Sequence, residues 1–162
     1  MEPVDLNIID KCSYLPNYLE INYSSILGAG LGIFAKKDLS GGKFLGNYVG
    51  IMKERTPSEI PFREQLYTFD TTKCNKIYTI NGYDLNTSNW TRFMNCALNS
   101  TQENVKLIRC TNKETYLIKN KKLNLDGYIM YYTKRDIKKG EELMYNYGDK
   151  YVSYLLSLNN KF

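Results

Sequence analysis

Turn-forming residues recur at short intervals along this chain, and their spacing limits every secondary-structure element to a short run. They are Gly28, Gly30, Gly32, Gly41, Gly42, Gly46, Gly50, Pro57, Pro61, Asn81, Gly82, Asp126, Gly127, Gly140 and Gly148. The runs between them are rich in Ile, Val, Thr, Tyr and Phe, which favour β-strands. This pattern predicts a mostly β fold built from several small sheets.

The individual elements follow from the same runs. The candidate strands span Tyr18–Tyr23, Leu31–Ala35, Phe44–Met52, Lys76–Ile80, Val105–Cys110, Thr115–Lys119, Tyr128–Thr133 and Glu142–Tyr145. Helical spacing is limited to Ser58–Glu64, a turn at Asn89–Met94 and a C-terminal helix at about 149–160. The polar segment Asn112–Asp126 is predicted to be a long hairpin or loop.

Length and composition predict one soluble domain. The chain has 162 residues, 43% of them hydrophobic, which is enough to bury a single core. We expect one domain over residues 1–162, with a core at about 18–151 that the C-terminal helix closes. No apolar run reaches the roughly 18 residues of a membrane span, and Met1–Asp5 does not resemble a secretory signal. These features predict an intracellular protein.

The chain contains no histidine, which excludes several kinds of chemistry. Neither a Ser-His-Asp nor a Cys-His nucleophile system can be built, and the usual general base near neutral pH is missing. Cys12, Cys74, Cys96 and Cys110 form no C-x-x-C pair, so we predict no structural zinc and no other metal site. The net charge of +5 arises from lysines spread in pairs, which is typical of a solvated surface.

Three segments combine residue types that can carry chemistry, and the first runs from Gly28 to Ala35. Its alternate glycines let the backbone turn tightly and come close to a ligand. It lacks the Lys-Ser/Thr of a phosphate-binding loop, and a β-run rather than a helix follows it. Taken alone, this segment favours a plain turn into a strand.

The second segment, Asn89 to Ala97, places a cation, an amide and large aromatic rings on one short helical turn. Asn95 offers both a donor and an acceptor for an amino-acid head group, and Arg92 can meet a carboxylate. The alternative is a buried turn with Trp90 in the core. Taken alone, this second segment favours the alternative.

The third segment, Gly140 to Tyr151, holds several of the chain's 15 tyrosines. Strand alternation predicts that Tyr145 and Tyr147 share one face. Such a face is usually core packing, yet buried phenol hydroxyls need hydrogen-bond partners. The segment therefore predicts either a polar part of the core or an aromatic channel.

Taken together and in this order, the segments resemble the SET-domain family of protein-lysine methyltransferases. Gly28–Gly32 is similar to the family's Gly-x-Gly opening, and Gly46–Gly50 is similar to its Glu-Tyr-Val-Gly strand. Arg92–Cys96 is similar to Arg-Phe-x-Asn-His, and Glu142–Tyr147 is similar to Glu-Leu-x-x-Asp-Tyr. The resemblance covers about residues 18–151 and implies the SET fold, with several small sheets, short helices and a C-terminal helix.

The sequence departs from the family pattern at three points. Cys96 stands where most members have His, which resembles the Asn-Cys motif of the PR/SET branch. Asn146 replaces the usual Asp. The cysteine-rich pre-SET and post-SET zinc modules are absent from this sequence, so Tyr151 and the C-terminal helix are expected to close the site.

The resemblance implies S-adenosylmethionine as cofactor, S-adenosylhomocysteine as its product, and a role for each site residue. The cofactor-binding residues would be Ala29, Gly30, Leu31, Tyr67, Arg92, Asn95, Cys96, Tyr147 and Tyr151. The substrate-binding residues would be Tyr48, Phe69, Tyr131 and Tyr145, which with Tyr147 would line a channel for lysine. The catalytic residues would be Tyr147, Tyr48 and Tyr145, with Tyr145 limiting the product to mono- or dimethyl-lysine.

The resemblance also implies a partner and a location. We expect a lysine-containing protein as substrate, first of all a histone tail, and a nuclear or chromatin-associated protein. One alternative is a PR-like protein-interaction module with little activity, which need not bind S-adenosylmethionine. Another is a small basic nucleic-acid binder, which the dispersed lysines argue against. We expect no sequence-specific nucleic acid contact and no membrane partner.

Overall fold

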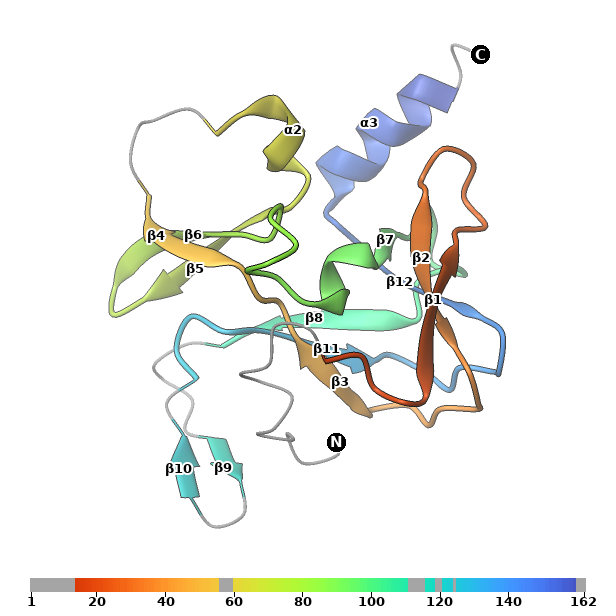
Figure 1. Cartoon of the computed structure of the whole chain (residues 1–162), viewed down its shortest axis with the longest axis horizontal. Helices are drawn as coiled ribbons and strands as arrows, with labels where there is room; N and C mark the ends of the chain where they lie inside the picture. Colours follow the sequence, from red (N-terminus) through yellow and green to blue (C-terminus); the bar gives the residue numbers. More distant parts are fainter. Residues whose placement is uncertain (1–13, 56–59, 111–115, 119–120, 124, 160–162) are drawn as a thin grey trace. The chain divides into compact units, whose positions relative to one another are not determined.

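The protein has a mostly β fold with few short helices (Figure 1). The structure is a computed structural model that describes residues 14–55, 60–110, 116–118, 121–123 and 125–159. The chain divides into two compact units. The first unit comprises Met1–Leu15, Phe44–Arg92 and Ile108–Tyr131, and the second comprises Pro16–Lys43, Phe93–Leu107 and Tyr132–Phe162. The single domain expected over the chain stays a prediction.

Short strands alternate with a few helical segments along the described chain. In sequence order they are β1 (Leu19–Tyr23), β2 (Leu31–Ala35), β3 (Phe44–Asn47), β4 (Ile51–Glu54), α2 (Phe62–Gln65), β5 (Thr68–Lys73), β6 (Lys76–Asn81), η1 (Trp90–Phe93), β7 (Asn95–Cys96), β8 (Val105–Arg109), β9 (Tyr116–Ile118), β10 (Lys121–Leu123), β11 (Ile129–Thr133), β12 (Glu142–Tyr145) and α3 (Asp149–Asn159). Among the described helices, none is long and apolar enough to cross a membrane.

The second unit contains a four-stranded sheet in the order β1-β2-β12-β7. β1 and β2 are antiparallel, with Tyr23 opposite Leu31. β12 lies antiparallel to β2 and parallel to β7, where Tyr145 is opposite Cys96. These pairings place parts of all three chemically suggestive segments on neighbouring strands.

The first unit contains an antiparallel sheet in the order β4-β6-β5. The sequence prediction did not include β5. Its pairing with β6 brings Lys73 opposite Lys76, so the two strands are joined by the two-residue turn Cys74–Asn75. Both turn residues have positive φ, 49° and 61°, as the tight turns of β-hairpins require.

The predicted strand Phe44–Met52 is wrong as a continuous element, because β3 ends at Asn47 and β4 begins at Ile51. Gly50 lies in the break and passes close to the backbone at Asn81. A Cβ at Gly50 would overlap the Asn81 carbonyl, so the chain has room there only for glycine. The turn redirects the chain between the two strands.

Several other predicted boundaries shift by a few residues. The helix expected at Ser58–Glu64 appears as α2, with residues 56–59 outside the described part. The C-terminal helix expected at about 149–160 appears as α3, with residue 160 outside the described part. The expected strand Thr115–Lys119 appears as β9, and its end residues are not described. β9 pairs antiparallel with β10, as a hairpin in the polar segment predicts.

A further sheet has the order β3-β11-β8. The boundary between the units falls inside β8, after Leu107, and inside β11, after Tyr131. In the first unit the core includes Cys110 and Ile129. In the second unit it includes Ile33, Cys96 and Leu143, each on a different strand of the four-stranded sheet. Burial of these apolar side chains is what holds the strands that carry the candidate site.

Candidate active site

The glycine segment forms the turn between β1 and β2 in the second unit. The Ser24 N–H donates to the Gly30 carbonyl at 2.8 Å, and the Ala29 N–H donates to the Ile26 carbonyl at 3.1 Å. Gly28 and Gly30 have positive φ, 81° and 74°, which favours glycine. A Cβ placed at either glycine would meet no atom within 4 Å. The turn therefore presents open backbone that a ligand can approach closely.

Asn95 lies on β7 and is tied to β2 and β12 through its side-chain amide. Its Nδ2 donates to the Leu31 carbonyl at 3.0 Å and to Glu142 Oε1 at 3.0 Å. A flipped amide would turn its oxygen against a carbonyl and a carboxylate, so the observed orientation is the favourable one. Both amide hydrogens are used in this way, and the Asn95 Oδ1 atom faces away from these two acceptors.

Cys96 follows Asn95 on β7 and is buried. Burial raises the pKa of its thiol, against a smaller lowering by a hydrogen bond from the Tyr147 backbone. A thiol that stays protonated is a poor nucleophile. The side chain at this position therefore contributes packing, and what it offers a ligand is its backbone.

Three tyrosines of the third segment form a row of rings in the second unit. The ring centroids of Tyr145 and Tyr147 are 4.7 Å apart, and those of Tyr147 and Tyr151 are 5.1 Å apart. β12 ends at Tyr145, so the row continues past the strand into α3. The Tyr147 hydroxyl donates to the Met94 carbonyl at 2.5 Å, which fixes the ring in the middle of the row.

A second aromatic group lies in the first unit, around Tyr48. Its ring meets Phe69 edge-on, with centroids 4.7 Å apart and planes at 69°. Its hydroxyl donates to the Tyr67 carbonyl at 2.6 Å. Burial raises the pKa of Tyr48 well above its usual range, an effect that the positive charge of Arg92 reduces. Tyr48 therefore acts as a neutral hydrogen-bond donor.

Arg92 lies in the η1 turn and is held in place by the first unit's own backbone. Its Nε donates to the Gly82 carbonyl at 2.9 Å, and its Nη2 donates to the Tyr83 carbonyl at 2.8 Å. The guanidinium also lies 4.6 Å from the centre of the Tyr67 ring, close enough for a cation–π contact. Arg92 and Tyr67 thus form one fixed pair.

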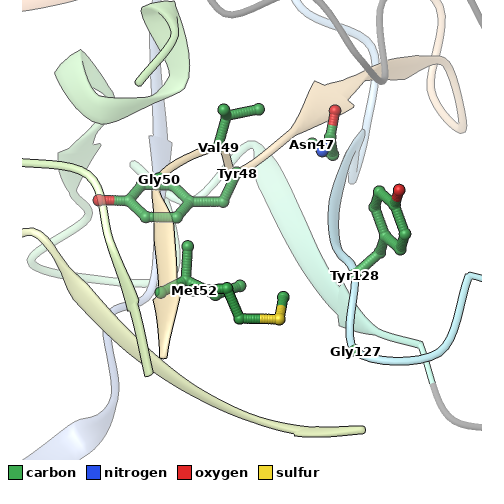
Figure 2. A pocket seen from close by; sticks show the side chains of 8 residues that line it. Asn47, Tyr48, Val49, Gly50, Met52, Gly127 and Tyr128 are labelled. Atoms are coloured by element: carbon green, nitrogen blue, oxygen red, sulfur yellow. The ribbon is translucent and has the colours of Figure 1, made fainter. Parts of the chain in front are cut away.

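A cavity of about 220 Å³ opens in the first unit beside Tyr48. It is lined by Asn47, Tyr48, Val49, Gly50, Met52, Ile80, Gly127 and Tyr128. Figure 2 shows the side chains of Tyr48, Met52 and Tyr128 around it. Of the predicted site residues, this cavity includes Tyr48 alone.

The predicted site residues therefore fall into two groups. The second unit holds Ala29, Gly30, Leu31, Asn95, Cys96, Tyr145, Tyr147 and Tyr151, and the first holds Tyr48, Tyr67, Phe69, Arg92 and Tyr131. Tyr131 is fully buried in β11. In the described part of the chain, no three His, Cys, Asp or Glu side chains are grouped as metal ligands.

The sequence reasoning missed one polar contact in the second unit. Glu142 is only 8% exposed, although the rest of β12 is apolar or aromatic. Its carboxylate is held by Ser24 and Ser25, which precede the glycine turn. A charged residue in an otherwise apolar strand was a signal in the sequence, because a buried carboxylate requires several donors.

Comparison with known proteins adds a family and two structural relatives. Residues 30–148 match the family model described as SET domain. The fold is similar to the methyltransferase domain of human PR domain-containing protein 2, with a TM-score of 0.61 and 25% identity over 83% of this chain and 81% of that one. It is also similar to a humanized mutant of the Chaetomium thermophilum Polycomb Repressive Complex 2 bound to the inhibitor GSK126, with a TM-score of 0.55, 23% identity, and 81% and 15% of the two chains covered.

Proposed function

We propose that this chain, which belongs to the SET-domain family, transfers a methyl group from S-adenosylmethionine to a lysine side chain of a protein. The observation that carries this proposal is the arrangement of the second unit. Its sheet brings the strand after the open glycine turn next to the strand that leads into the tyrosine row, with Asn95 on the following strand. The likeness to a methyltransferase domain at 25% identity also supports it.

The residues of the glycine turn suit this cofactor, which supplies a methyl group on a cationic sulfur. The backbone at Ala29, Gly30 and Leu31 would hold it, since the turn is open. The Asn95 Oδ1 atom is directed away from Leu31 and Glu142. It can therefore accept a hydrogen bond from the ammonium group of the cofactor's amino-acid part. The faces of Tyr147 and Tyr151 attract positive charge, by roughly 1–2 kcal/mol per desolvated contact.

The family pattern extends the cofactor site to Tyr67, Arg92 and the backbone of Cys96. Tyr67 and Arg92 are fixed against each other by the cation–π contact, so together they offer one flat aromatic and cationic surface. We propose that this surface and Cys96 bind parts of the cofactor.

A lysine amine must be neutral to attack a methyl group. Aromatic, poorly hydrated surroundings lower the pKa of an amine, because desolvation disfavours the charged ammonium. We propose that Tyr145 and Tyr147 provide such surroundings, and that Tyr48, Phe69 and Tyr131 also take part in substrate binding, as the family pattern implies. No histidine base is then needed.

Tyr147 is the residue that we expect to orient the amine. Its hydroxyl is held by the Met94 carbonyl and its ring by Tyr145 and Tyr151, so little freedom is left to the side chain. A positioned group contributes to the rate by alignment rather than by a covalent bond.

Tyr145 is proposed to limit the number of methyl groups added. It is 3% exposed, so its hydroxyl occupies space beside Tyr147 that water and further methyl groups would need. We therefore propose mono- or dimethyl-lysine as the product. The substrate we propose first is a histone tail, which would place the protein in a nucleus or on chromatin.

Two measurements test this function together. Calorimetry with S-adenosylmethionine should give binding to the protein, and labelled methyl groups should then appear on a histone-peptide array. A protein that binds no S-adenosylmethionine would favour the alternative of a protein-interaction module. Binding without methylation of any histone peptide, but with methylation of other proteins, would correct the substrate alone.

A further inference from the structure

The carboxylate of Glu142 joins β12 to the residues that start the glycine turn. Ser24 Oγ donates to Glu142 Oε1 at 2.8 Å, and Ser25 donates to Oε2 twice, from its N–H at 2.9 Å and from its Oγ at 2.6 Å. Ser24 Oγ also accepts the Ile26 N–H at 3.0 Å. Hydrogen bonds to a charged acceptor are stronger than neutral ones, so these contacts fix the start of the turn. We call Ser24, Ser25 and Glu142 the serine–glutamate clamp.

The clamp also fixes the other side of the turn. Ser24 closes the turn through the bond from its N–H to the Gly30 carbonyl. Glu142 Oε1 accepts from Asn95 Nδ2, and the same Nδ2 donates to the Leu31 carbonyl. One buried carboxylate therefore sets both the shape of the turn and the orientation of the Asn95 amide.

Gly32 makes room for this carboxylate. A Cβ at Gly32 would overlap Glu142 Oε1 and lie 3.2 Å from Asn95 Nδ2. Gly32 is buried, whereas Gly28 and Gly30 have open space beside them. The glycines thus have different roles. Gly28 and Gly30 leave the turn open to a ligand, and Gly32 leaves space for the Glu142 carboxylate.

We infer that Glu142 is a positioning residue, which holds the glycine turn and the Asn95 amide in the shape that binds S-adenosylmethionine. This inference rests on the proposed function. Glu142 is 8% exposed and acts through Ser24, Ser25 and Asn95 rather than by its own contact with a ligand. A fixed turn loses less conformational freedom on binding, so the clamp strengthens cofactor binding without taking part in methyl transfer.

The test removes the two serine hydroxyls, which leaves the buried carboxylate and the β-sheet in place. In the double variant Ser24→Ala and Ser25→Ala, we expect the Kd for S-adenosylmethionine from calorimetry to rise about tenfold. The kcat at saturating cofactor should stay within about twofold, because binding alone is weakened. Threonine at both positions restores the hydroxyls and should recover the affinity to within about threefold.

Two further variants complete the comparison. Ser100→Ala removes an exposed hydroxyl from the same unit and should leave Kd unchanged. Gly32→Ala, if its thermal unfolding shows a folded protein, should weaken binding like the double variant, since its methyl group displaces Glu142. An unchanged Kd in the double variant, or a loss that threonine does not restore, would overturn the inference.

Hydrogen exchange separates failure of the clamp from failure of the proposed function. Without any cofactor, the amides of Ser24 and Ala29 should exchange faster in the double alanine variant than in the unmodified protein, because their bonds close the turn. Unchanged exchange refutes the clamp itself. Unmodified protein that binds no S-adenosylmethionine refutes the proposed function, and with it the cofactor role of the clamp.

Discussion

Both units gather tyrosines, but the two groups use their phenol rings differently. In the first unit the rings meet edge-on, with planes at 69° between Tyr48 and Phe69 and at 63° between Tyr67 and Tyr83. In the second unit the rings of the tyrosine row contact one another in series, from the buried end of β12 to the half-buried start of α3. The ring planes of the row are closer to parallel, at 38° and 30°. In both groups a hydroxyl donates to a backbone carbonyl, Tyr48 to Tyr67 and Tyr147 to Met94, so the groups differ in ring geometry.

A tyrosine count alone therefore does not separate structure from chemistry. Substitutions in the first group should change the free energy of unfolding, and substitutions in the row should change methyl transfer. Variants of both groups can test that separation, and their expected effects range from a large loss of activity to a small dependence on pH.

Tyr147→Phe should have the largest effect on methyl transfer. The variant loses the hydroxyl that anchors the ring to Met94, and a misplaced group in an active site can cost about a hundredfold in rate. We expect kcat with labelled cofactor to fall by at least that factor, while the thermal unfolding midpoint falls by only a few degrees, as the loss of one hydrogen bond predicts. Tyr23→Phe is the matched control, because Tyr23 is 81% exposed on β1. Full activity in Tyr147→Phe would refute its assignment.

Gly82→Ala should have the largest effect on stability. A Cβ at Gly82 would lie 2.5 Å from the Tyr48 hydroxyl oxygen and 2.8 Å from its Cζ, so the buried ring must move. Overpacking of this kind costs about 1–3 kcal/mol in the free energy of unfolding. Denaturant unfolding measures it, with Gly140→Ala as a contrast where a positive φ gives strain without overpacking. A Gly82→Ala variant as stable as the unmodified protein would break the proposed distinction between the groups.

Tyr145→Phe should change the product rather than the rate. Removal of its hydroxyl frees space next to Tyr147, and we expect a larger share of more highly methylated lysine. Mass spectrometry of a methylated peptide distinguishes the products. Trimethyl-lysine from the unmodified protein would contradict the role given to Tyr145.

Tyr48→Phe should lower the free energy of unfolding by about 1 kcal/mol, the net value of one hydrogen bond. The loss is moderate because the Tyr67 carbonyl keeps its second donor, the Gly82 N–H at 2.8 Å. Denaturant unfolding measures the difference. A loss of methyl transfer in this variant without any loss of stability would assign Tyr48 to the chemistry alone.

The smallest effect is a dependence on alkaline pH. The pKa of Tyr48 is raised above its usual 10.0 in the folded protein, so the unfolded state releases this proton first. The protonated Tyr48 hydroxyl therefore contributes fully to the free energy of unfolding below pH 10. This contribution decreases as pH rises above 10, by less than about 1 kcal/mol at about pH 10.5. The difference in unfolding free energy between the unmodified protein and Tyr48→Phe should shrink over this range. A difference that does not change with pH would refute the role of Tyr48 in this pH dependence.

The sequence predicted the β-rich class and most strands, because turn residues and β-branched or aromatic runs are local signals. It missed β5, although the two-residue turn Cys74–Asn75 marks the hairpin with β6 and Asn tolerates positive φ. It also joined β3 to β4, because the close passage of Gly50 by Asn81 depends on a distant part of the chain. A local sequence pattern cannot predict a close contact between two distant segments of the chain.

The candidate site was likewise predictable where it depends on local motifs and unpredictable where it depends on contacts between residues far apart in the sequence. The order of motifs predicted which residues to consider, and the sheet places Asn95 and the glycine turn on strands joined through β12. The clamp was not predicted, since Ser24 and Ser25 are far from Glu142 in sequence and ordinary in composition. The backbone partners of Arg92 and Tyr48 were equally beyond local reasoning.

The buried cysteines offer a way to observe each unit opening by itself. Cys96 belongs to the second unit and Cys110 to the first, both have little exposure, and Cys74 is exposed on the β5–β6 turn. Among the described cysteines, a thiol reagent should modify Cys74 at once and should reach Cys96 and Cys110 only when their unit opens. The modification rates of Cys96 and Cys110 therefore compare the local stabilities of the two units without any introduced cysteine.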